Sequence, residues 1–208
     1  MSTTEPTRQQ TAPTEQPARG LTSARPKRAD ARRNYDRVIA AARSAFTESG
    51  AETSLEGIAR RAGVGIGTLY RHFPTRQALL EAVYVEEVER LCNSAAELAR
   101  LEPWEAFAAW AEGLVDYMAT KLALASELFD YVDRDAPVFT SCRASLFAAG
   151  GPLLQRAQAA GVVRDDVDIA EVIQLIGGIT KIQGAEPAQI RRLLSIALDG
   201  LRRHPRDD

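Results

Sequence analysis

The 208-residue sequence predicts an all-α protein of about nine helices, arranged as a three-helix N-terminal unit and a larger helical unit. From residue 29 onward, apolar residues recur three or four positions apart, which is the spacing of one face of an α-helix. No segment alternates apolar and polar residues as a half-buried strand would. Hydrophobic residues make up 45% and charged residues 26%, so the composition is that of an ordinary globular protein.

Composition also argues against several classes of protein. The two cysteines, Cys92 and Cys142, have no metal or redox spacing around them. The longest apolar runs fall well short of the ~20 residues that span a bilayer, and the N-terminus has no apolar core of a signal peptide. We therefore expect a cytoplasmic protein with no disulfide, no metal, no cofactor and no membrane partner.

Catalysis finds little support. Neither histidine, His72 or His204, has a serine or cysteine partner in a recognisable motif. The run Gly63-x-Gly65-x-Gly67 resembles a phosphate loop, but Thr68 stands where that motif needs glycine and no strand precedes it. We expect that the protein is not an enzyme.

Charge is divided unevenly along the chain. Residues 25–43 hold seven cationic and two anionic side chains, whereas residues 91–208 hold 12 cationic and 17 anionic ones. A basic N-terminal end on an acidic chain is typical of a nucleic-acid-binding head, although a solvated basic helix face would look the same. Residues 1–27, rich in Thr, Pro, Gln and Arg, predict a disordered tail whose basic end could touch DNA or stay in solvent.

The N-terminal unit is predicted over residues 28–76. Its first helix spans Ala29–Ser49 and ends at Gly50. Thr53 and Glu56 predict a capping box that opens a short helix ending at Ala62. Gly63 gives a sharp turn into a second short helix, Ile66–Phe73, and Thr75 caps a long helix. Two short helices joined by a glycine turn predict a helix-turn-helix, whose second helix fits a DNA major groove.

The larger unit is predicted over residues 77–208. After the long helix, five more helices fit the apolar spacing: Pro103–Lys121, Ala123–Val132, Pro137–Ala160, Asp168–Gln183 and Pro187–Arg203. The helix that begins at Pro103 is apolar on more than one face, so we expect it at the centre of its domain.

Residues 33–88 resemble the DNA-binding domain of the tetracycline-repressor-like (TetR/AcrR) family of bacterial transcription regulators. The resemblance rests on these residues in order: Phe46, Gly50, Thr53-Ser54-Leu55, Ile58-Ala59, Ala62-Gly63-Val64, Gly67-Thr68-Leu69-Tyr70, His72-Phe73 and Leu79-Leu80. The chain departs from the family pattern at Gly57, where an acidic residue is usual, and at Arg76-Gln77, where Lys-Glu is usual.

The resemblance implies an operator of double-stranded DNA and assigns residues to it. Those on the groove face of the second short helix would be Thr68, Tyr70, Arg71 and His72. Arg71 would contact a guanine edge or a phosphate. Backbone at Gly65 and Gly67 could approach phosphates closely, and the remaining phosphate contacts would come from Thr53, Ser54 and Arg76.

The second unit resembles a receptor for a small molecule. Eight of the 13 aromatic residues lie between Trp104 and Phe147. Such side chains could line an apolar pocket or fill an ordinary core. The ligand-binding candidates are Trp104, Phe107, Trp110, Tyr117, Met118, Phe129 and Phe147. Glu112, Asp116 and the acidic stretch 130–135 would suit a cationic ligand.

The last two helices carry aliphatic stripes without aromatic residues. The resemblance implies that they form a four-helix bundle with their copies in a homodimer, although they could instead close the protomer's own core. The dimerisation candidates are Ile173, Ile176, Gly177, Ile190, Leu194, Ala197 and Leu201.

The function that these expectations imply is a dimeric repressor, released from a palindromic operator by a small apolar ligand. Two alternatives stay open. One is a ligand-independent regulator or architectural DNA-binding protein of the same fold. The other is a small-molecule-binding protein with a vestigial DNA head.

Overall fold

A computed structural model describes residues 29–50, 53–131 and 136–203, without the side chains at 125–127 and 129–131. Within this part the chain forms eight helices, and its extended pairing is limited to one isolated bridge between Val163 and Arg202. The predicted all-α fold is confirmed. The predicted tail, residues 1–27, lies outside the described residues.

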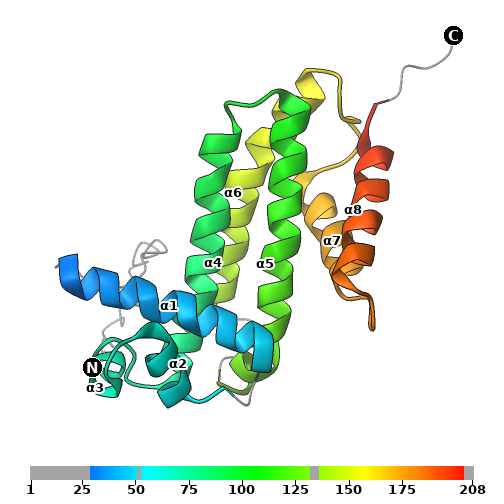
Figure 1. Cartoon of the computed structure of the whole chain (residues 1–208). Coiled ribbons are helices and arrows are strands. Elements are labelled where there is room, and N and C mark those ends of the chain that lie inside the picture. The colour runs from blue at the N-terminus through cyan, green and yellow to red at the C-terminus, as the bar shows by residue number, and fades with distance from the viewer. Residues whose placement is uncertain (1–28, 51–52, 132–135, 204–208) are drawn as a thin grey trace, which may run out of the picture.

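The first three helices form a small unit at one end of the molecule (Figure 1). They are α1 (Ala29–Ser49), α2 (Leu55–Ala62) and α3 (Ile66–His72). A common core holds them together, to which α1 contributes Val38 and Phe46, α2 contributes Ile58 and α3 contributes Leu69. All four side chains are almost fully buried. Leu69 is the one buried residue of the short α3, so the position of this helix depends on its packing in this core.

Helix α4 (Arg76–Leu98) runs from this unit along the larger one. Thr75 caps it, as predicted, because its hydroxyl accepts a bond from the N–H of Ala78 at 3.0 Å. The helix packs against α1 as well as against α5 and α6. The predicted domain boundary between residues 76 and 77 therefore falls in the first turn of a helix that belongs physically to both units, and the division stays a prediction.

Helix α5 (Pro103–Tyr131) is central, because α1, α4, α6, α7 and α8 all pack against it. The prediction of two helices with a break at Leu122 is wrong. Leu124 and Leu128 are almost fully buried and extend the apolar face that Tyr117 begins. Burial of this face in the core stabilises a continuous helix. No glycine, proline or capping residue stands at the predicted break.

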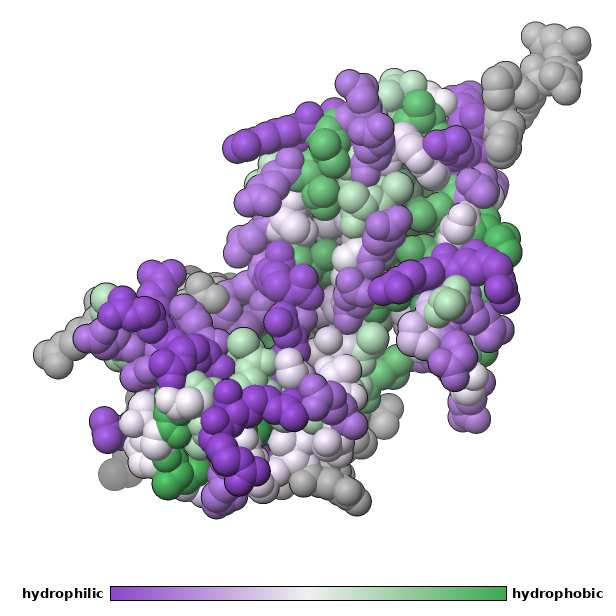
Figure 2. Space-filling view, in the orientation of Figure 1, coloured by the Kyte–Doolittle hydropathy of each residue, from purple (hydrophilic) through white to green (hydrophobic). Residues whose placement is uncertain are grey.

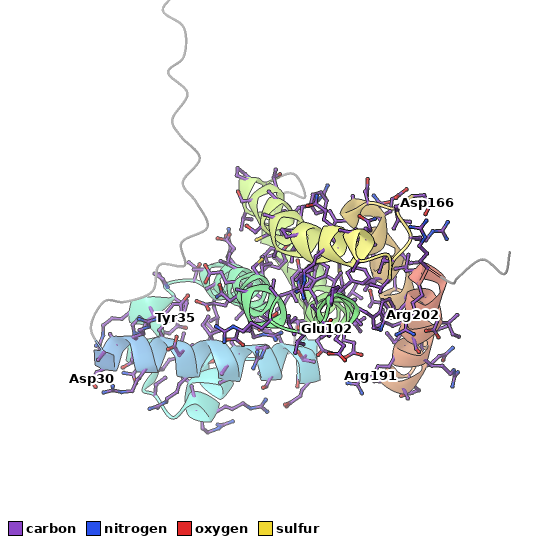
Figure 3. All side chains as sticks on the ribbon, turned by 90° about the horizontal axis from the view of Figure 1, so that it is seen from above. Asp30, Tyr35, Glu102, Asp166, Arg191 and Arg202 are labelled. Carbon is purple, nitrogen blue, oxygen red and sulfur yellow. The ribbon has the colours of Figure 1, made fainter. Side chains whose placement is uncertain are left out.

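The remaining helices complete a bundle and a side layer (Figure 1). Helix α6 (Pro137–Ala159) lies antiparallel to α5, while α7 (Ile169–Thr180) and α8 (Pro187–Leu201) lie together beside them. Asp168 and Glu171 form a reciprocal capping box at the start of α7, with N–H to carboxylate distances of 2.8 and 2.9 Å. Viewed from above in Figure 3, α1 with Tyr35 and α8 with Arg202 lie on opposite sides of the molecule.

Candidate DNA-binding face and ligand cavity

The start of α2 is capped by Ser54 rather than by Thr53. The hydroxyl of Ser54 accepts a bond from the N–H of Gly57 at 3.0 Å, whereas Thr53 is buried and its hydroxyl donates to the carbonyl of Ala45 at 2.9 Å. The predicted capping box of Thr53 and Glu56 is therefore wrong by one residue. With Ser54 as the cap, Gly57 occupies the third helical position, where a glutamate would complete the box. Thr53 has its hydroxyl turned into the protein, and Ser54 remains exposed.

The turn between α2 and α3 depends on Gly63. Its φ of 63° lies in the left-handed region, which glycine adopts without strain. Arg37 of α1 secures the turn, because its Nε donates to the carbonyl oxygen of Ala62 at 2.8 Å and its guanidinium also bonds the carbonyl of Gly63. The first helix therefore sets the angle at which α3 leaves the turn.

Helix α3 presents one face to solvent. Leu69 is fully buried, whereas Tyr70 is 44% exposed and Ile66 38% exposed, and both lie on the same side with Gly67 and Arg71. Thr68 and His72 are half-buried at its margin. Ile66 was not among the predicted DNA-binding residues, because an apolar side chain in a short helix is typical of the core, which here takes up Leu69 instead. Its exposed side chain adds apolar surface beside Tyr70 and Arg71.

His72 belongs partly to an aromatic cluster. Its ring meets the ring of Tyr35 edge-on, with centroids 6.1 Å apart, and Phe73 lies 5.1 Å from Tyr35. This packing fixes the orientation of the imidazole at the edge of the exposed face.

Arg76 lies against the protein rather than out in solvent. Its guanidinium carbon is 5.2 Å from the centroid of the Phe46 ring, and one of its nitrogens donates to the carbonyl of Thr53. These contacts join the start of α4 to the end of α1 and to the segment before α2. They favour a bracing role over the predicted phosphate contact.

A cavity of about 640 Å³ lies among α4, α5, α6 and α7. Three of the predicted ligand residues line it, namely Tyr117, Met118 and Phe147. The side chain of Phe129 lies outside the described residues. The other lining residues are Tyr84, Lys121, Leu122, Phe139, Arg143, Leu146, Ala170, Ile173, Gln174, Gly177, Gly178, Thr180 and Lys181.

The structure places Trp104, Phe107 and Trp110 away from this cavity. Phe107 and Trp110 are fully buried in the core, and Trp110 occupies the space beside Gly150, where an added Cβ would come within 2.3 Å of its ring. Trp104 sits near the start of α5 beneath Arg202, whose guanidinium carbon is 4.2 Å from the ring centroid. These aromatic residues hold helices together.

The charge of the cavity is opposite to the expectation. Its described lining includes Lys121, Arg143 and Lys181 and no carboxylate. Burial, together with the nearby charges of Arg143 and Lys181, lowers the pKa of Lys121. Glu112 and Asp116 are exposed outside the cavity lining, so they do not suit this cavity to a cationic ligand. The side chains of the acidic stretch 130–135 lie outside the described residues.

Two tyrosines form a polar pair in the cavity wall. The hydroxyl of Tyr117 donates to the hydroxyl of Tyr84 at 3.1 Å, across the α4–α5 contact. Burial raises the pKa of Tyr84 to about 12 and raises that of Tyr117 as well, so both hydroxyls are neutral hydrogen-bonding groups at physiological pH.

The predicted dimerisation residues lie mostly within the protomer. Ile176, Gly177, Leu194 and Leu201 are buried, Ile173 and Gly177 line the cavity, and Ile190 and Ala197 are half-buried. The exposed apolar side chains of the α7–α8 region are others: Leu175 (43% exposed), Ile182 (44%) and Ile196 (61%). Figure 2 shows apolar surface at the outer edge of this layer. The predicted residues lie on the inner side of these helices. Apolar residues buried within a protomer and those buried between protomers recur at the same helical spacing, so the spacing alone does not distinguish them.

Comparison with known proteins identifies the family. A family model described as bacterial regulatory proteins, tetR family, matches residues 38–83, and one described as transcriptional regulator SbtR-like, C-terminal domain, matches residues 102–203. The TetR transcriptional regulator SCO0520 from Streptomyces coelicolor is 42% identical, with a TM-score of 0.74, covering 82% of this chain and 99% of that one. The chain belongs to the TetR family of transcriptional regulators.

Other TetR-family relatives agree. A TetR transcription regulatory protein from Mycobacterium vanbaalenii is 37% identical, with a TM-score of 0.69, covering 85% of this chain and 99% of that one. The HTH-type transcriptional regulator UidR of Escherichia coli is 34% identical over 96 residues. That match covers 45% of this chain and 43% of UidR, so the chain matches less than half the length of this curated relative.

Membership confirms the resemblance and the DNA-binding N-terminal domain. TetR-family regulators bind DNA and dimerise, and the family is non-enzymatic, which confirms the expectation that the chain is not an enzyme. No helix among the described residues is long and apolar enough to cross a membrane. The same part of the chain has no group of three or more His, Cys, Asp or Glu side chains that could hold a metal ion.

Proposed function

We propose that this TetR-family chain is a homodimeric repressor that a small ligand releases from a palindromic operator. The N-terminal unit, residues 28–76, would bind DNA, and residues 77–208 would bind the ligand and the second subunit. Two copies of α3 would enter successive major grooves, about 34–36 Å apart.

Base contacts would come from the exposed face of α3. Arg71 would read a guanine edge or hold a phosphate, while Tyr70 and Ile66 would lie against sugars and thymine methyl groups. Gly67 leaves open space, since nothing lies within 4 Å of an added Cβ, so its backbone can approach DNA closely. Thr68, His72, Ser54 and the backbone at Gly65 would flank these contacts, and Thr53 and Arg76 would act by holding the unit together.

The dimer contact would use the exposed stripe of the α7–α8 layer. Leu175 lies on α7, Ile182 follows the end of that helix by two residues, and Ile196 lies on α8. Large exposed aliphatic residues that cluster on one layer of a soluble protein mark an interaction surface.

The observation that carries the ligand response is the double role of α7. Ile173 and Gly177 of this helix line the cavity, whereas Leu175, two residues from each, is exposed on the other side. A ligand that moves α7 would therefore change the dimer contact. The same cavity touches Tyr84 of α4, the helix whose first turn is braced against the DNA-binding unit. Coupling of this kind is reciprocal, so operator DNA should weaken ligand binding by the same factor.

Binding to DNA from immediately upstream of the protein's own gene tests the proposal, measured against random duplex at ~150 mM salt, where non-specific affinity is weak. Saturable binding by two subunits per site, with a footprint centred on an inverted repeat, is the expected result. Equal affinity for random duplex would count against an operator at that position. Binding of a single subunit per site would refute the proposal that a homodimer binds the operator.

A further inference from the structure

We propose that the ligand of the α4–α7 cavity is a small organic anion, with an apolar or aromatic body and an acidic head group such as a carboxylate. This inference rests on the proposed receptor function and specifies the chemistry of its ligand.

Three cations converge on the cavity from three segments. Lys121 comes from α5, Arg143 from α6, and Lys181 from the residue that follows α7. The charges of Arg143 and Lys181 both lower the pKa of Lys121, which places each of them near its ammonium group. The gathering of lysine is notable in this chain: its lysines are Lys27, Lys121 and Lys181, all other cationic side chains being arginine, and two of the three line this cavity.

Nothing in the described part of the protein neutralises these charges. The described cavity lining holds no aspartate or glutamate, and none of the three cations forms an ion pair with a described carboxylate. Lys121 is half-buried, and desolvation is the largest cause of its lowered pKa. Arg143 and Lys181 are exposed, so the cost of an uncompensated charge falls mainly on Lys121, and a ligand of the opposite sign would relieve it.

The rest of the lining indicates the chemistry of the ligand outside its acidic head group. Apolar and aromatic surface is supplied by Met118, Phe139, Leu146, Phe147 and Ile173. Gln174 and Thr180 add neutral polar groups. A volume of about 640 Å³ lies in the range of small-molecule sites. The combination favours an amphipathic anion over a neutral lipid-like molecule, which would leave the half-buried Lys121 without a counter-charge, and over a cation, which would be repelled.

Two fluorescent probes that differ by a single acidic group test the inference on the full-length protein. The anion is 8-anilinonaphthalene-1-sulfonate, and the neutral probe is N-phenyl-1-naphthylamine, which lacks the sulfonate. Dissociation constants for both are measured by titration with the unaltered protein and with Lys121→Met and Lys181→Met. Lys121→Arg serves as the charge-retaining control, and Arg100→Gln removes an exposed cation outside the cavity lining.

We expect the anionic probe to bind at least about tenfold more tightly than the neutral one, the scale of a charge-assisted hydrogen bond. Each lysine-to-methionine variant should weaken the anionic probe about tenfold and leave the neutral probe within about twofold. The two controls should behave as the unaltered protein. Far-ultraviolet circular dichroism of every variant checks that the helices are retained.

The possible failures are distinguishable. Equal affinity for the two probes, with no response to either lysine variant but weaker binding of both to Phe147→Ala, would overturn the anion inference and leave the receptor proposal standing. Absence of saturable binding by either probe would overturn both the inference and the ligand response. Operator binding, measured separately, would be untouched by that result.

Discussion

Arg43 of α1 lies 3.0 Å from the carboxylate of Glu87 of α4, and this ion pair joins the DNA-binding unit to the helix that enters the larger one. Glu87 is 3% exposed, and its second oxygen lies 2.8 Å from Arg90. The carboxylate is thus shared by two arginines that are themselves partly exposed. It is the buried member of a three-residue network at the contact between α1 and α4, two helices that connect the DNA-binding unit with the larger one.

Glu87→Gln should lower the free energy of unfolding by about 1–2 kcal/mol, because charge-assisted hydrogen bonds are lost while both arginines keep access to water. Urea unfolding measures the change. Glu97→Gln, on the exposed surface of the same helix, is the control and should change stability by less than about 0.5 kcal/mol. Equal effects of the two variants would show that the network contributes nothing specific.

Gly63→Ala should destabilise the protein by about 1–2 kcal/mol, because an L-residue is strained at a φ of 63°. An added Cβ would also lie 3.1 Å from the Arg37 guanidinium that secures the turn. Gly67→Ala is the matched variant: it sits in α3 with open space around it, so it should leave stability equal or raise it by up to ~1 kcal/mol.

Gly63→Ala and Gly67→Ala also distinguish an effect on stability from an effect on DNA binding. Gly67→Ala should weaken operator binding despite its neutral or favourable effect on stability, because the new methyl group faces the proposed DNA surface. Unfolding curves and operator titrations of both variants provide the measurement. Operator affinity unchanged in a stable Gly67→Ala protein would mean that the backbone there does not approach DNA.

Arg71→Ala and Arg76→Ala should act differently. Arg71 is exposed on α3, so its loss should leave stability unchanged and relax base preference at one operator position, at a cost of about 1–3 kcal/mol in binding. Arg76 packs on Phe46 and bonds a carbonyl, so its loss should lower stability by about 1 kcal/mol. Affinity for specific and random DNA, together with unfolding curves, distinguishes the roles. A variant of Arg76 that keeps full stability but loses one unit of salt dependence would restore the phosphate contact predicted from the sequence.

Much of this fold could be predicted because its signals are local. Helix ends follow from nearby residues such as Gly50, Gly63, Thr75 and Asp168, and each of these stands at a helix end in the structure. The cap at Ser54 was misplaced by one residue because Thr53 offers the same hydroxyl. Only the carbonyl of Ala45, eight residues away, decides which of the two turns inward.

The site was harder to predict because its signals are long-range. Trp110 is a core residue because Gly150, forty positions later, leaves room for its ring. The cationic cluster of the cavity comes from three distant positions, Lys121, Arg143 and Lys181. It can be recognised only once the fold brings these three segments together. An aromatic-rich segment indicates that large side chains must be buried, and it carries no information about which of them face an empty volume.

Gly150→Ala should destabilise the protein by about 1–3 kcal/mol or more, because its methyl group would overlap the ring of Trp110 in a core that cannot expand freely. Gly151→Ala, the next residue of α6, meets nothing within 4 Å and should be neutral or stabilising by up to ~1 kcal/mol. Chemical unfolding of the two proteins is the test. Similar stabilities would mean that Trp110 can move aside, and that its burial is not held by this contact.

Ile196→Glu should dissociate the proposed dimer while the protomer stays folded. The side chain is 61% exposed in the protomer, so a carboxylate there meets water in the monomer and an apolar partner surface in the dimer. A rise in the dimer dissociation constant of at least about tenfold is expected, measured by sedimentation equilibrium. Leu101→Glu is the control, because Leu101 is 41% exposed but lies in the connection between α4 and α5, outside α7 and α8. It should leave the oligomeric state unchanged, and operator binding should fall with Ile196→Glu alone. A dimer that survives Ile196→Glu and dissociates with Leu101→Glu would place the two-fold contact on the other side of the molecule and break the proposed route from the cavity through α7 to DNA.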